Sequence, residues 1–419
     1  MTTPTWPCSG LRWPDSVPTL IDPDRRVQLR AHRADDLARV VEMCTDPEFV
    51  RWTTTPHPYS AVDGRVFLGT FVPTEVDAGR SMMWAVAAID SASTRGDAAA
   101  RFCGTVEIRL QGDGVGEIAF GLHPDARGQG LLRRAGRLAL DWAFDVAGLR
   151  AVRWRAVVGN WDSRHLAAAL GFRFEGVRRA GLAQRGVLTD CWTATVLSTD
   201  PRTSVAPPRQ PTLRGAGVIL RPFAERDLPR IVEACADPQS QHWLGGLPRD
   251  YRAAHARDFL EHCRETAANF TDWTWSLTTP ETDECQGALT LFHLRDGSEA
   301  GELGYWTHPD ARGRGLTGAA ARAVADFALG ELADRTADGP VGRALTSRGI
   351  HRSLTVRVAV ENHASQAVAR RTGADLVGRL PEAERLGNDR WTDLFLFSRT
   401  RRSGAVEPGP ADGHSAVRT

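Results

Sequence analysis

The chain contains the six-residue sequence HPDARG twice, at His123–Gly128 and at His308–Gly313. The match continues upstream, where G-E-I-A-F-G-L (Gly116–Leu122) corresponds to G-E-L-G-Y-W-T (Gly301–Thr307). An identical stretch of this length with matched flanks indicates an internal duplication. We therefore expect two copies of one fold, which agrees with a length of 419 residues.

Two further matches set the limits of each repeat. The sequence V-Q-L-R-A-H-R-A-D-D-L begins the first repeat at Val27, and V-I-L-R-P-F-A-E-R-D-L begins the second at Val218. Farther on, V-G-N-W-D-S (Val158–Ser163) matches V-E-N-H-A-S (Val360–Ser365), at a longer distance from HPDARG in the second repeat. The longer distance predicts an insertion at Asp334–Arg348 in that repeat.

The chain is therefore expected to have five parts. These are an extended N-terminal segment (1–26), a first domain (27–198), a proline-rich linker (199–216), a second domain (217–400) and a disordered tail (401–419). The linker sequence S-T-D-P-R-T-S-V-A-P-P-R-Q-P-T is polar and rich in proline, which favours an extended conformation. Each domain is long enough to bury its own hydrophobic core.

Charge and cysteine content argue against several classes of function. The net charge is +1, so the sequence gives no broad positive field for nucleic acid or an anionic membrane. The seven cysteines are scattered, without the spacing typical of a zinc site, so we expect no metal and reduced thiols. The sequence has neither the pattern of a signal peptide nor an apolar run of about 18 residues. These features predict a cytoplasmic protein without nucleic-acid or membrane partners.

Hydrophobic periodicity predicts a regular order of elements. In the first repeat the expected strands are Val27–Arg30, Met83–Ile89, Gly104–Leu110, Gly116–Leu122 and Ala151–Val158, and the expected helices begin near Asp35 or cover Leu131–Val146 and Ser163–Leu170. Strand, glycine turn, helix, strand and helix in succession form an α/β unit. Five tryptophans in strand patterns are expected to pack in the cores or line a substrate cleft: Trp84, Trp154, Trp192, Trp275 and Trp391.

The glycine turn follows HPD in both repeats, as A-R-G-Q-G-L-L and as A-R-G-R-G-L-T. Small residues allow a tight turn between strand and helix, which leaves several N–H groups unpaired at the positive end of the helix. A phosphate or pyrophosphate group fits such a site. A glycine-rich turn of this kind can also be a simple connection, and its duplication with matched flanks favours the anion site.

These motifs together resemble the signature of the GNAT acetyltransferases. R-x-x-G-x-(small) follows a G-E-I/L-A/G-F/Y strand, and N-x-x-S with a closing glycine comes later in each repeat. Within this family the sequence is similar to the branch that contains ribosomal-protein N-terminal acetyltransferases and small-amine acetylating resistance enzymes. The resemblance implies an α/β protein with two tandem GNAT domains, each a mixed, mostly antiparallel sheet flanked by helices.

The resemblance also implies a binding loop for the pyrophosphate of acetyl-CoA, the expected co-substrate. In the first repeat the loop residues are Arg127, Gly128, Gln129 and Gly130, and in the second they are Arg312, Gly313, Arg314 and Gly315. The family usually has Gly or Ala two residues after the last loop glycine, whereas Leu132 and Thr317 occupy that place here.

The N-x-x-S element corresponds to Asn160 with Ser163 and to Asn362 with Ser365. In the family the asparagine contacts the pantetheine arm and the hydroxyl lies near the thioester sulfur, while either residue is also a favoured helix N-cap. Many relatives carry a tyrosine four residues after this serine as a general acid. Alanine stands at both of these positions in this chain, so we expect Ser163 and Ser365 to serve as substitutes for the tyrosine.

Glu117 and Glu302 lie on the strand that leads into the glycine turn. Either carboxylate could accept the proton of an attacking ammonium group through water, or form a structural hydrogen bond to the neighbouring strand. The resemblance predicts an N-acetyltransferase that transfers acetyl from acetyl-CoA to a primary amine, on a protein N-terminus or a small molecule, as a monomer or homodimer. The alternative is a catalytically silent tandem module that binds acetyl-CoA or a partner protein.

Overall fold

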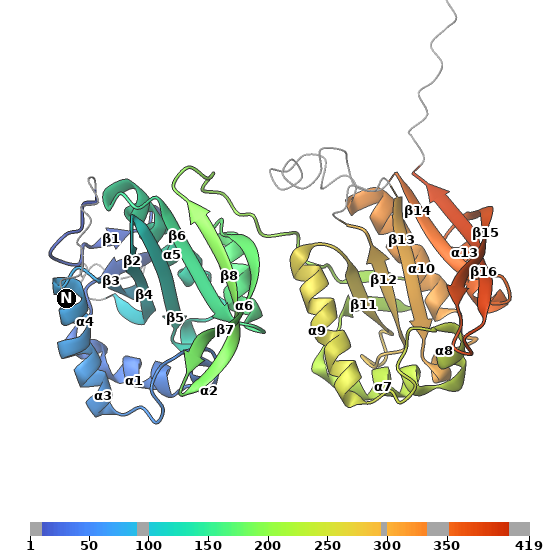
Figure 1. The fold of residues 1–419 in the computed structure, drawn as a ribbon, viewed down its shortest axis with the longest axis horizontal. Coiled ribbons are helices and arrows are strands. Elements are labelled where there is room, and N and C mark those ends of the chain that lie inside the picture. The colour runs from blue at the N-terminus through green and yellow to red at the C-terminus, as the bar shows by residue number, and fades with distance from the viewer. Residues whose placement is uncertain (1–10, 90–99, 295–299, 333–351, 402–419) are drawn as a thin grey trace, which may run out of the picture. The chain divides into compact units, whose positions relative to one another are not determined.

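The computed structural model describes residues 11–89, 100–294, 300–332 and 352–401. The chain divides into two compact units, Met1–Ala206 and Pro207–Thr419, which are the first and second domains below. Figure 1 shows a sheet with flanking helices in each, the first coloured blue to green and the second yellow-green to red. The predicted insertion at 334–348, Cys8 and the tail beyond Arg401 lie outside the described residues.

The sheet of the first domain has eight strands in the order β1-β2-β3-β4-β5-β6-β8-β7. β5 and β6 are parallel and every other neighbouring pair is antiparallel. The strands are β1 (Leu20–Ile21), β2 (Val27–Arg30), β3 (Ser81–Ala88), β4 (Arg101–Gly112), β5 (Val115–Leu122), β6 (Ala151–Val157), β7 (Arg173–Gln184) and β8 (Val187–Leu197).

The second domain repeats this topology, with the order β15-β16-β14-β13-β12-β11-β10-β9 and a parallel pair of β13 and β14. Its strands are β9 (Leu213–Gly215), β10 (Val218–Pro222), β11 (Trp273–Thr278), β12 (Gly287–Phe292), β13 (Ala300–Thr307), β14 (Ser353–Ala359), β15 (Asp375–Arg385) and β16 (Trp391–Thr400). Both sheets are mixed and mostly antiparallel, which confirms the predicted fold class.

Helices cover both faces of each sheet. In the first domain they are α1 (Leu37–Thr45), α2 (Pro47–Trp52), α3 (Ala61–Val66), α4 (Val72–Asp77), α5 (Leu131–Asp141) and α6 (Trp161–Ala169). In the second domain they are α7 (Leu228–Ala236), α8 (Pro238–Trp243), α9 (Ala253–Asn269), α10 (Leu316–Phe327) and α13 (His363–Arg371). α5 and α10 each cross from one parallel strand to the next, because a parallel pair cannot be joined by a tight hairpin.

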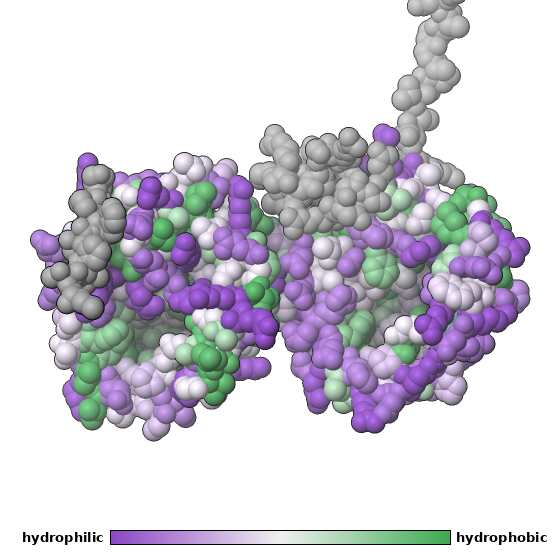
Figure 2. All heavy atoms as spheres, in the orientation of Figure 1, coloured by the Kyte–Doolittle hydropathy of each residue, from purple (hydrophilic) through white to green (hydrophobic). Residues whose placement is uncertain are grey.

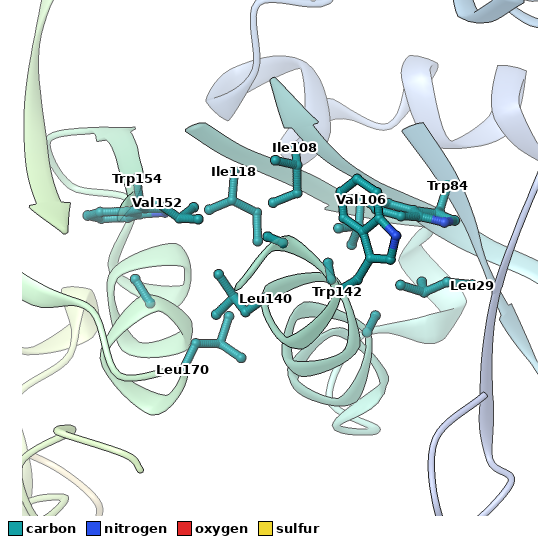
Figure 3. Close-up of a cluster of buried hydrophobic side chains, with 14 of the residues drawn as sticks. Leu29, Trp84, Val106, Ile108, Ile118, Leu140, Trp142, Val152, Trp154 and Leu170 are labelled. Atoms are coloured by element: carbon teal, nitrogen blue, oxygen red, sulfur yellow. The ribbon is translucent and has the colours of Figure 1, made fainter. Parts of the chain in front are cut away.

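The main core of the first domain lies between the sheet and α5. Figure 3 shows Trp84 and Trp142 at one end of this cluster and Trp154 with Val152 at the other. Side chains alternate along β3, so Trp84 faces α5 while its neighbour Ala85 faces α1, in a second cluster with Val40. The second domain has the same arrangement around α10, with Trp273 and Trp275 fully buried.

The residues before each first full strand are attached to the sheet that follows. The indole Nε1 of Trp84 donates to the carbonyl of Pro18 at 2.9 Å, and that of Trp275 donates to the carbonyl of Pro211 at 2.7 Å. Upstream of Pro211, the backbone N–H of Val205 donates to the carbonyl of Ala168 in the first domain at 2.9 Å. The residues between the repeats are thus hydrogen-bonded at both ends, each to its own domain.

The elements agree with the sequence pattern except in detail. The helix expected at Leu131–Val146 is α-helical to Asp141 and then widens into a π-helical turn, which leaves Val146 51% exposed. α6 begins two residues before the expected Ser163, because Asn160 is its N-cap. Four of the five predicted tryptophans are buried, whereas Trp391 is 58% exposed and does not pack in a core, so for this residue only the predicted position at a substrate cleft is left.

Figure 2 shows mainly polar residues on the visible face of each domain, with apolar residues in smaller groups between them. Within the described ranges, no helix is both long and apolar enough to cross a membrane. The two largest clusters of buried apolar residues are the main cores of the two domains.

Candidate active site

The parallel strands of the first domain separate halfway along their length. β5 pairs with β6 from Val115 to Ile118, and its remaining residues Ala119–Leu122 pair with β4 alone. β6 continues on its other side against β8. The backbone groups of Ala119–Leu122 that face β6 therefore have no strand partner in the described structure, and a ligand can bind them.

The second domain separates at the corresponding place. β13 pairs with β14 from Ala300 to Glu302, and Leu303–Thr307 continue without a strand on that side. The HPDARG motif follows β13 as it follows β5, so the glycine turn stands at the open end of the gap in both domains. The duplication has thus preserved the gap and the turn together.

The glycine turn of the first domain presents backbone N–H groups. Gly128 and Gly130 have φ angles of +74° and +72°, a left-handed conformation that other residues rarely adopt. A Cβ at either position would meet no atom within 4 Å, so the space beside the turn is open. Gly130 is the N-cap of α5, whose first hydrogen bond runs from the N–H of Arg134 to the Gly130 carbonyl at 3.4 Å. The preceding N–H groups have no acceptor within the helix and can bind an anion.

The arginine of each loop forms an ion pair with the N-cap aspartate of a short helix, α2 in the first domain and α8 in the second. Arg127 pairs with Asp46, and Arg312 pairs with Asp237 at 2.5 Å and with the Ser240 hydroxyl at 3.0 Å. Burial works against ionisation of both aspartates, but these arginines and a backbone N–H outweigh it, so the pKa of each carboxyl is lowered. The two guanidinium groups fix the loops in place, and the backbone is left to contact an anion.

The remaining loop residues differ between the domains. Gln129 donates to the carbonyl of Asp125 at 2.6 Å, whereas Arg314 at the same place contacts Gln286 at 3.5 Å. The second domain also brings Arg371, at the end of α13, to the turn: a Cβ at Gly315 would lie 2.9 Å from its Nη1. Among the described residues Arg371 forms no ion pair.

The side chains two residues after the loops are engaged within their domains. Leu132 packs against the core beside α5. The hydroxyl of Thr317 is hydrogen-bonded to that of Thr307 at 2.6 Å, and Thr317 is 5% exposed. The departure from the family's small residue is thus accommodated differently in the two domains.

The two asparagines act as helix N-caps. Asn160 Oδ1 accepts from the N–H of Ser163 at 3.2 Å, and Asn362 Oδ1 accepts from the N–H of Ser365 at 3.0 Å. The serine hydroxyls face the strands: Ser163 Oγ accepts from the indole of Trp154 at 3.1 Å, and Ser365 Oγ lies 2.9 Å from the Tyr305 hydroxyl. Capping therefore places both serines at the gap.

Glu117 and Glu302 form cross-strand ion pairs. Both Glu117 oxygens accept from Arg155 on β6 at 2.8 Å, and Glu302 accepts from Arg357 on β14 at 2.9 and 3.0 Å. Glu117 alternates with Ile118 of the core, so it lies on the sheet face away from α5. The hydrogen bonds with Glu117 raise the pKa of Arg155.

On this face the domains differ in charge. In the first, Ser81, Glu107 and Arg109 extend the Glu117 pair into a row of polar contacts 2.5 to 3.6 Å long. In the second, strand pairing places Thr290 and Phe292 where the first has Glu107 and Arg109. Acceptor molecules that reach the gap from this face meet different surroundings in the two domains.

The hairpin at the end of each sheet closes over the helices by different means. In the first domain Arg185 donates to the carbonyls of Val50, Thr53 and Thr55 at 2.9 to 3.3 Å. In the second, the N–H of Gly387 donates to the His242 carbonyl at 2.8 Å. The two backbones lie so close here that a Cβ on residue 387 would collide with the carbonyl oxygen of Gln241.

The sequence reasoning missed this closure, and it missed Tyr305 and Arg371 as partners of the site. It named Trp154 as a core or cleft residue but did not predict its hydrogen bond to Ser163. The signal for Tyr305 was present in the strand alternation, which puts Leu303 and Tyr305 on the face of α10. His123 is 6% exposed and contacts Glu42 and Asp125 at 2.9 and 2.8 Å, as a local residue of the turn. No group of three metal-ligating side chains occurs among the described residues.

Comparison with known proteins gives a family match in both halves of the chain. The model of the acetyltransferase (GNAT) domain matches residues 26–173 and 218–375, more than half of the sequence. A comparison with curated proteins gives no match. The family match confirms the predicted resemblance and the tandem duplication.

Several solved acetyltransferases resemble one half of the chain. RimL, a ribosomal L7/L12 alpha-N-protein acetyltransferase in complex with coenzyme A, is 18% identical, with a TM-score of 0.38 over 45% of this chain and 98% of its own. RimJ of Mycobacterium smegmatis with CoA-disulfide is 20% identical, with a TM-score of 0.38 over 44% and 88%. MccE, the microcin C7 self-immunity acetyltransferase with acetyl-CoA and AMP, is 17% identical, with a TM-score of 0.35 over 44% and 92%. The chain belongs to the GNAT acetyltransferase family and carries two copies of its acetyltransferase domain.

Proposed function

We propose that the chain transfers the acetyl group of acetyl-CoA to a primary amine, by direct attack of the amine on the thioester. The observation that carries this proposal is the gap between parallel strands, found in both domains with a glycine turn at its open end. A phosphate-binding turn next to unpaired strand backbone suits a ligand with a pyrophosphate and an amide-bearing arm.

The residues of the site divide between the two ends of this ligand. The backbone at Gly128–Gly130 and Gly313–Gly315 would hold the pyrophosphate, with Arg127 and Arg312 fixing each loop. The strand residues Ala119–Leu122 and Leu303–Thr307 would pair with the amides of the arm. Asn160 and Asn362 would lie at the far end of the arm, where Ser163 and Ser365 would face the thioester sulfur.

The reaction forms a C–N bond and breaks the C–S bond. The electron pair of the C–S bond goes to sulfur. One proton leaves the attacking nitrogen and one is taken up by CoA, both through water. Alignment of two bound reactants supplies effective molarities of about 10⁵–10⁸ M, whereas acid or base assistance supplies about 10²–10⁴-fold. The missing tyrosine therefore affects the smaller of the two contributions.

We assign the proton relay to Glu117 and Glu302. A carboxylate offers about four lone-pair sites, and a bidentate arginine occupies two of them. Arg155 and Arg357 thus leave each carboxylate able to accept a hydrogen bond from a water next to the amine. The ion pair also holds the strands at the point where they separate, so the catalytic and structural roles of these glutamates are compatible.

Calorimetric titration of acetyl-CoA tests the proposal. Gly130→Asp and Gly315→Asp place a carboxylate where the pyrophosphate would bind, and each is expected to abolish one binding event. Gly186→Asp and Gly217→Asp are matched controls, because these glycines also have positive φ and open surroundings but lie in other turns. Loss of binding in the controls, or no binding by folded wild type, would contradict the proposal.

A panel of amines then identifies the acceptor. Peptides with free N-termini, polyamines and aminoglycosides are incubated with acetyl-CoA, and free CoA thiol is measured. Transfer to any of them excludes the silent module, and transfer that survives one loop variant but not the other assigns the active domain. Binding of acetyl-CoA without transfer to any amine would favour the silent module.

A further inference from the structure

The hydroxyl of each candidate serine contacts one side chain from a strand that borders the gap. In the first domain this side chain is Trp154 of β6, whose Nε1 lies 3.1 Å from Ser163 Oγ. In the second it is Tyr305 of β13, whose hydroxyl lies 2.9 Å from both Ser365 Oγ and the Ser365 carbonyl oxygen. The two contacts come from opposite sides of the gap.

The two domains differ at both of these strand positions. Alignment of the repeats puts Phe120 of β5 at the place of Tyr305, and Val356 of β14 at the place of Trp154. Each domain therefore has one polar aromatic residue and one apolar residue at these two positions. Figure 3 shows that Trp154 lies at the end of the buried cluster, away from Trp84 and Trp142.

Packing alone does not account for this pattern. Both strand positions border the core, where two apolar side chains would pack without any hydrogen bond. A buried indole or phenol needs a partner for its polar atom, which makes it the more demanding choice. Both domains nevertheless retain one such group, and in both domains its partner is the serine.

The type of partner fixes the direction of the serine hydrogen. An indole N–H is a donor only, so Ser163 Oγ accepts from Trp154 and its own hydrogen is left for another acceptor. The Tyr305 hydroxyl has a single hydrogen, which it donates to the Ser365 carbonyl at 2.9 Å. It gives the same result for the serine when this hydrogen is shared with Ser365 Oγ, which lies at the same distance. Burial raises the pKa of Tyr305 to about 12, so this hydroxyl keeps its proton at neutral pH.

We propose that Trp154 and Tyr305 are positioning residues that turn the hydroxyl hydrogens of Ser163 and Ser365 toward the sulfur of acetyl-CoA. The inference rests on the proposed function. When the C–S bond breaks, its electron pair goes to sulfur, and the serine O–H donates a hydrogen bond to the thiolate. The serine keeps its proton, and the proton that finally forms the CoA thiol comes from water, replacing the one released by the nitrogen.

The test uses the full chain with hydroxylamine and acetyl-CoA. Hydroxylamine is a small nucleophile that is uncharged at pH 7, so neither the acceptor pocket nor the base limits the rate. Trp154→Phe is examined with Gly315→Asp silencing the second domain, and Tyr305→Phe with Gly130→Asp silencing the first. Each is expected to lower kcat about tenfold at an unchanged KM for acetyl-CoA, which is less than the full contribution of acid–base assistance of about 10²–10⁴-fold.

Double variants and matched controls separate positioning from packing. Adding Ser163→Ala to Trp154→Phe, or Ser365→Ala to Tyr305→Phe, is expected to cause no further loss, because the pair acts as a unit. Trp84→Phe and Tyr251→Phe remove a buried indole and a buried phenol elsewhere in the same domains and should leave kcat unchanged. Phe120→Tyr in the Trp154→Phe chain installs the arrangement of the second domain and should restore the rate.

Each other outcome overturns the inference. If Trp154→Phe and Tyr305→Phe retain the kcat of the parent while the serine variants lose it, the positioning role is wrong and the proposed function stands. If they lose acetyl-CoA affinity and melting temperature as well as rate, their role is structural packing. A parent chain that binds acetyl-CoA but forms no acetohydroxamate contradicts the proposed function and the positioning role together.

Discussion

The two glycine turns have the same backbone and different charges around it. In the first domain Arg133 stands on the third residue of α5, and Gln129 lies within the loop. In the second domain Gly318 replaces that arginine, and its missing side chain makes room for Arg371, whose Cδ would lie 2.6 Å from a Cβ there. The arginine beside the turn thus comes from α5 in the first domain and from α13 in the second.

The position of Arg371 is electrostatically unfavourable without an anion. The first turn of α10 carries the positive end of the helix dipole, which repels a nearby cation. An arginine without an ion pair in the described structure, held against such a turn, becomes favourable when a phosphate binds between them. With Arg314 also in its loop, the second domain is expected to bind acetyl-CoA more tightly than the first, and with a steeper dependence on salt.

The largest expected difference concerns the hairpins. Gly387→Ala would bring a Cβ onto the carbonyl oxygen of Gln241, and such overpacking costs about 1–3 kcal/mol. Arg185→Ala removes the corresponding contact in the first domain and is expected to cost about 1 kcal/mol, since the arginine is exposed. Scanning calorimetry measures both, and equal losses would show that the hairpins close in the same way.

The next effect concerns the charge at the turn. Arg371→Ala is expected to weaken acetyl-CoA binding by the second domain about tenfold, or about 1.4 kcal/mol, and to reduce its salt dependence. The measurement is calorimetry in a Gly130→Asp chain, where only the second site remains. Arg370→Ala is the matched control, because that arginine lies over the Phe397 ring. Unchanged affinity after Arg371→Ala would show that Arg371 does not strengthen acetyl-CoA binding by the second domain.

A smaller effect is expected at the aspartates of the HPDARG motifs. The hydrogen bond from Arg39, with His123 adding to it, lowers the pKa of Asp125 to about 2, and Arg230 lowers that of Asp310. Because its pKa is depressed, ionised Asp125 stabilises the folded domain above its ordinary pKa of 3.8, and this contribution is lost as the pH falls toward 2.

Asp125→Asn is therefore expected to lower stability at pH 7 by less than about 1 kcal/mol, because the carboxylate is partly exposed and its ion pairs are screened. Thermal unfolding at pH 7 and at pH 2 tests this, and the difference between wild type and variant should be much smaller at the lower pH. Asp310→Asn is the counterpart in the second domain. A variant effect of the same size at both pH values would exclude the ionised carboxylate as its origin.

The smallest expected effect concerns the titration of the tyrosines, and of Tyr305 in particular. The chain has three tyrosines, and burial raises the pKa of all three, with Tyr305 the lowest at about 12. Because these pKa values are raised, folding is favoured below pH 10 and is progressively weakened as the pH rises toward 12. Absorbance of phenolate should be absent from the native protein at pH 10, and Tyr305→Phe should remove the first tyrosine to titrate. Phenolate in native protein at pH 10 would contradict burial of these groups.

The sequence predicts local features of this molecule well. Alternation along 116–122 and 151–158 places both central strands, and the glycines at 128 and 130 place the turn, because these signals depend on neighbouring residues. Asn160 was open to two interpretations, and the structure shows the cap while leaving its ligand contact as a proposal.

The contacts that distinguish the domains lie beyond such reasoning. Tyr305 meets Ser365 across sixty positions of sequence, and Arg371 reaches Gly315 because α13 ends beside α10. The exposure of Val146 follows from a widened helical turn, which apolar spacing does not reveal. Distances between elements depend on packing, which a single sequence does not specify.

An eight-stranded open sheet ordinarily has two edges, whereas the separation of β5 from β6, and of β13 from β14, adds a pair of short inner edges to each sheet. Unpaired strand edges recruit extended chains and promote aggregation. A bound amide-bearing arm would cover these inner edges, as an added strand does elsewhere. The co-substrate would then also protect the protein against aggregation. The protein should therefore aggregate least during storage when it is saturated with the co-substrate.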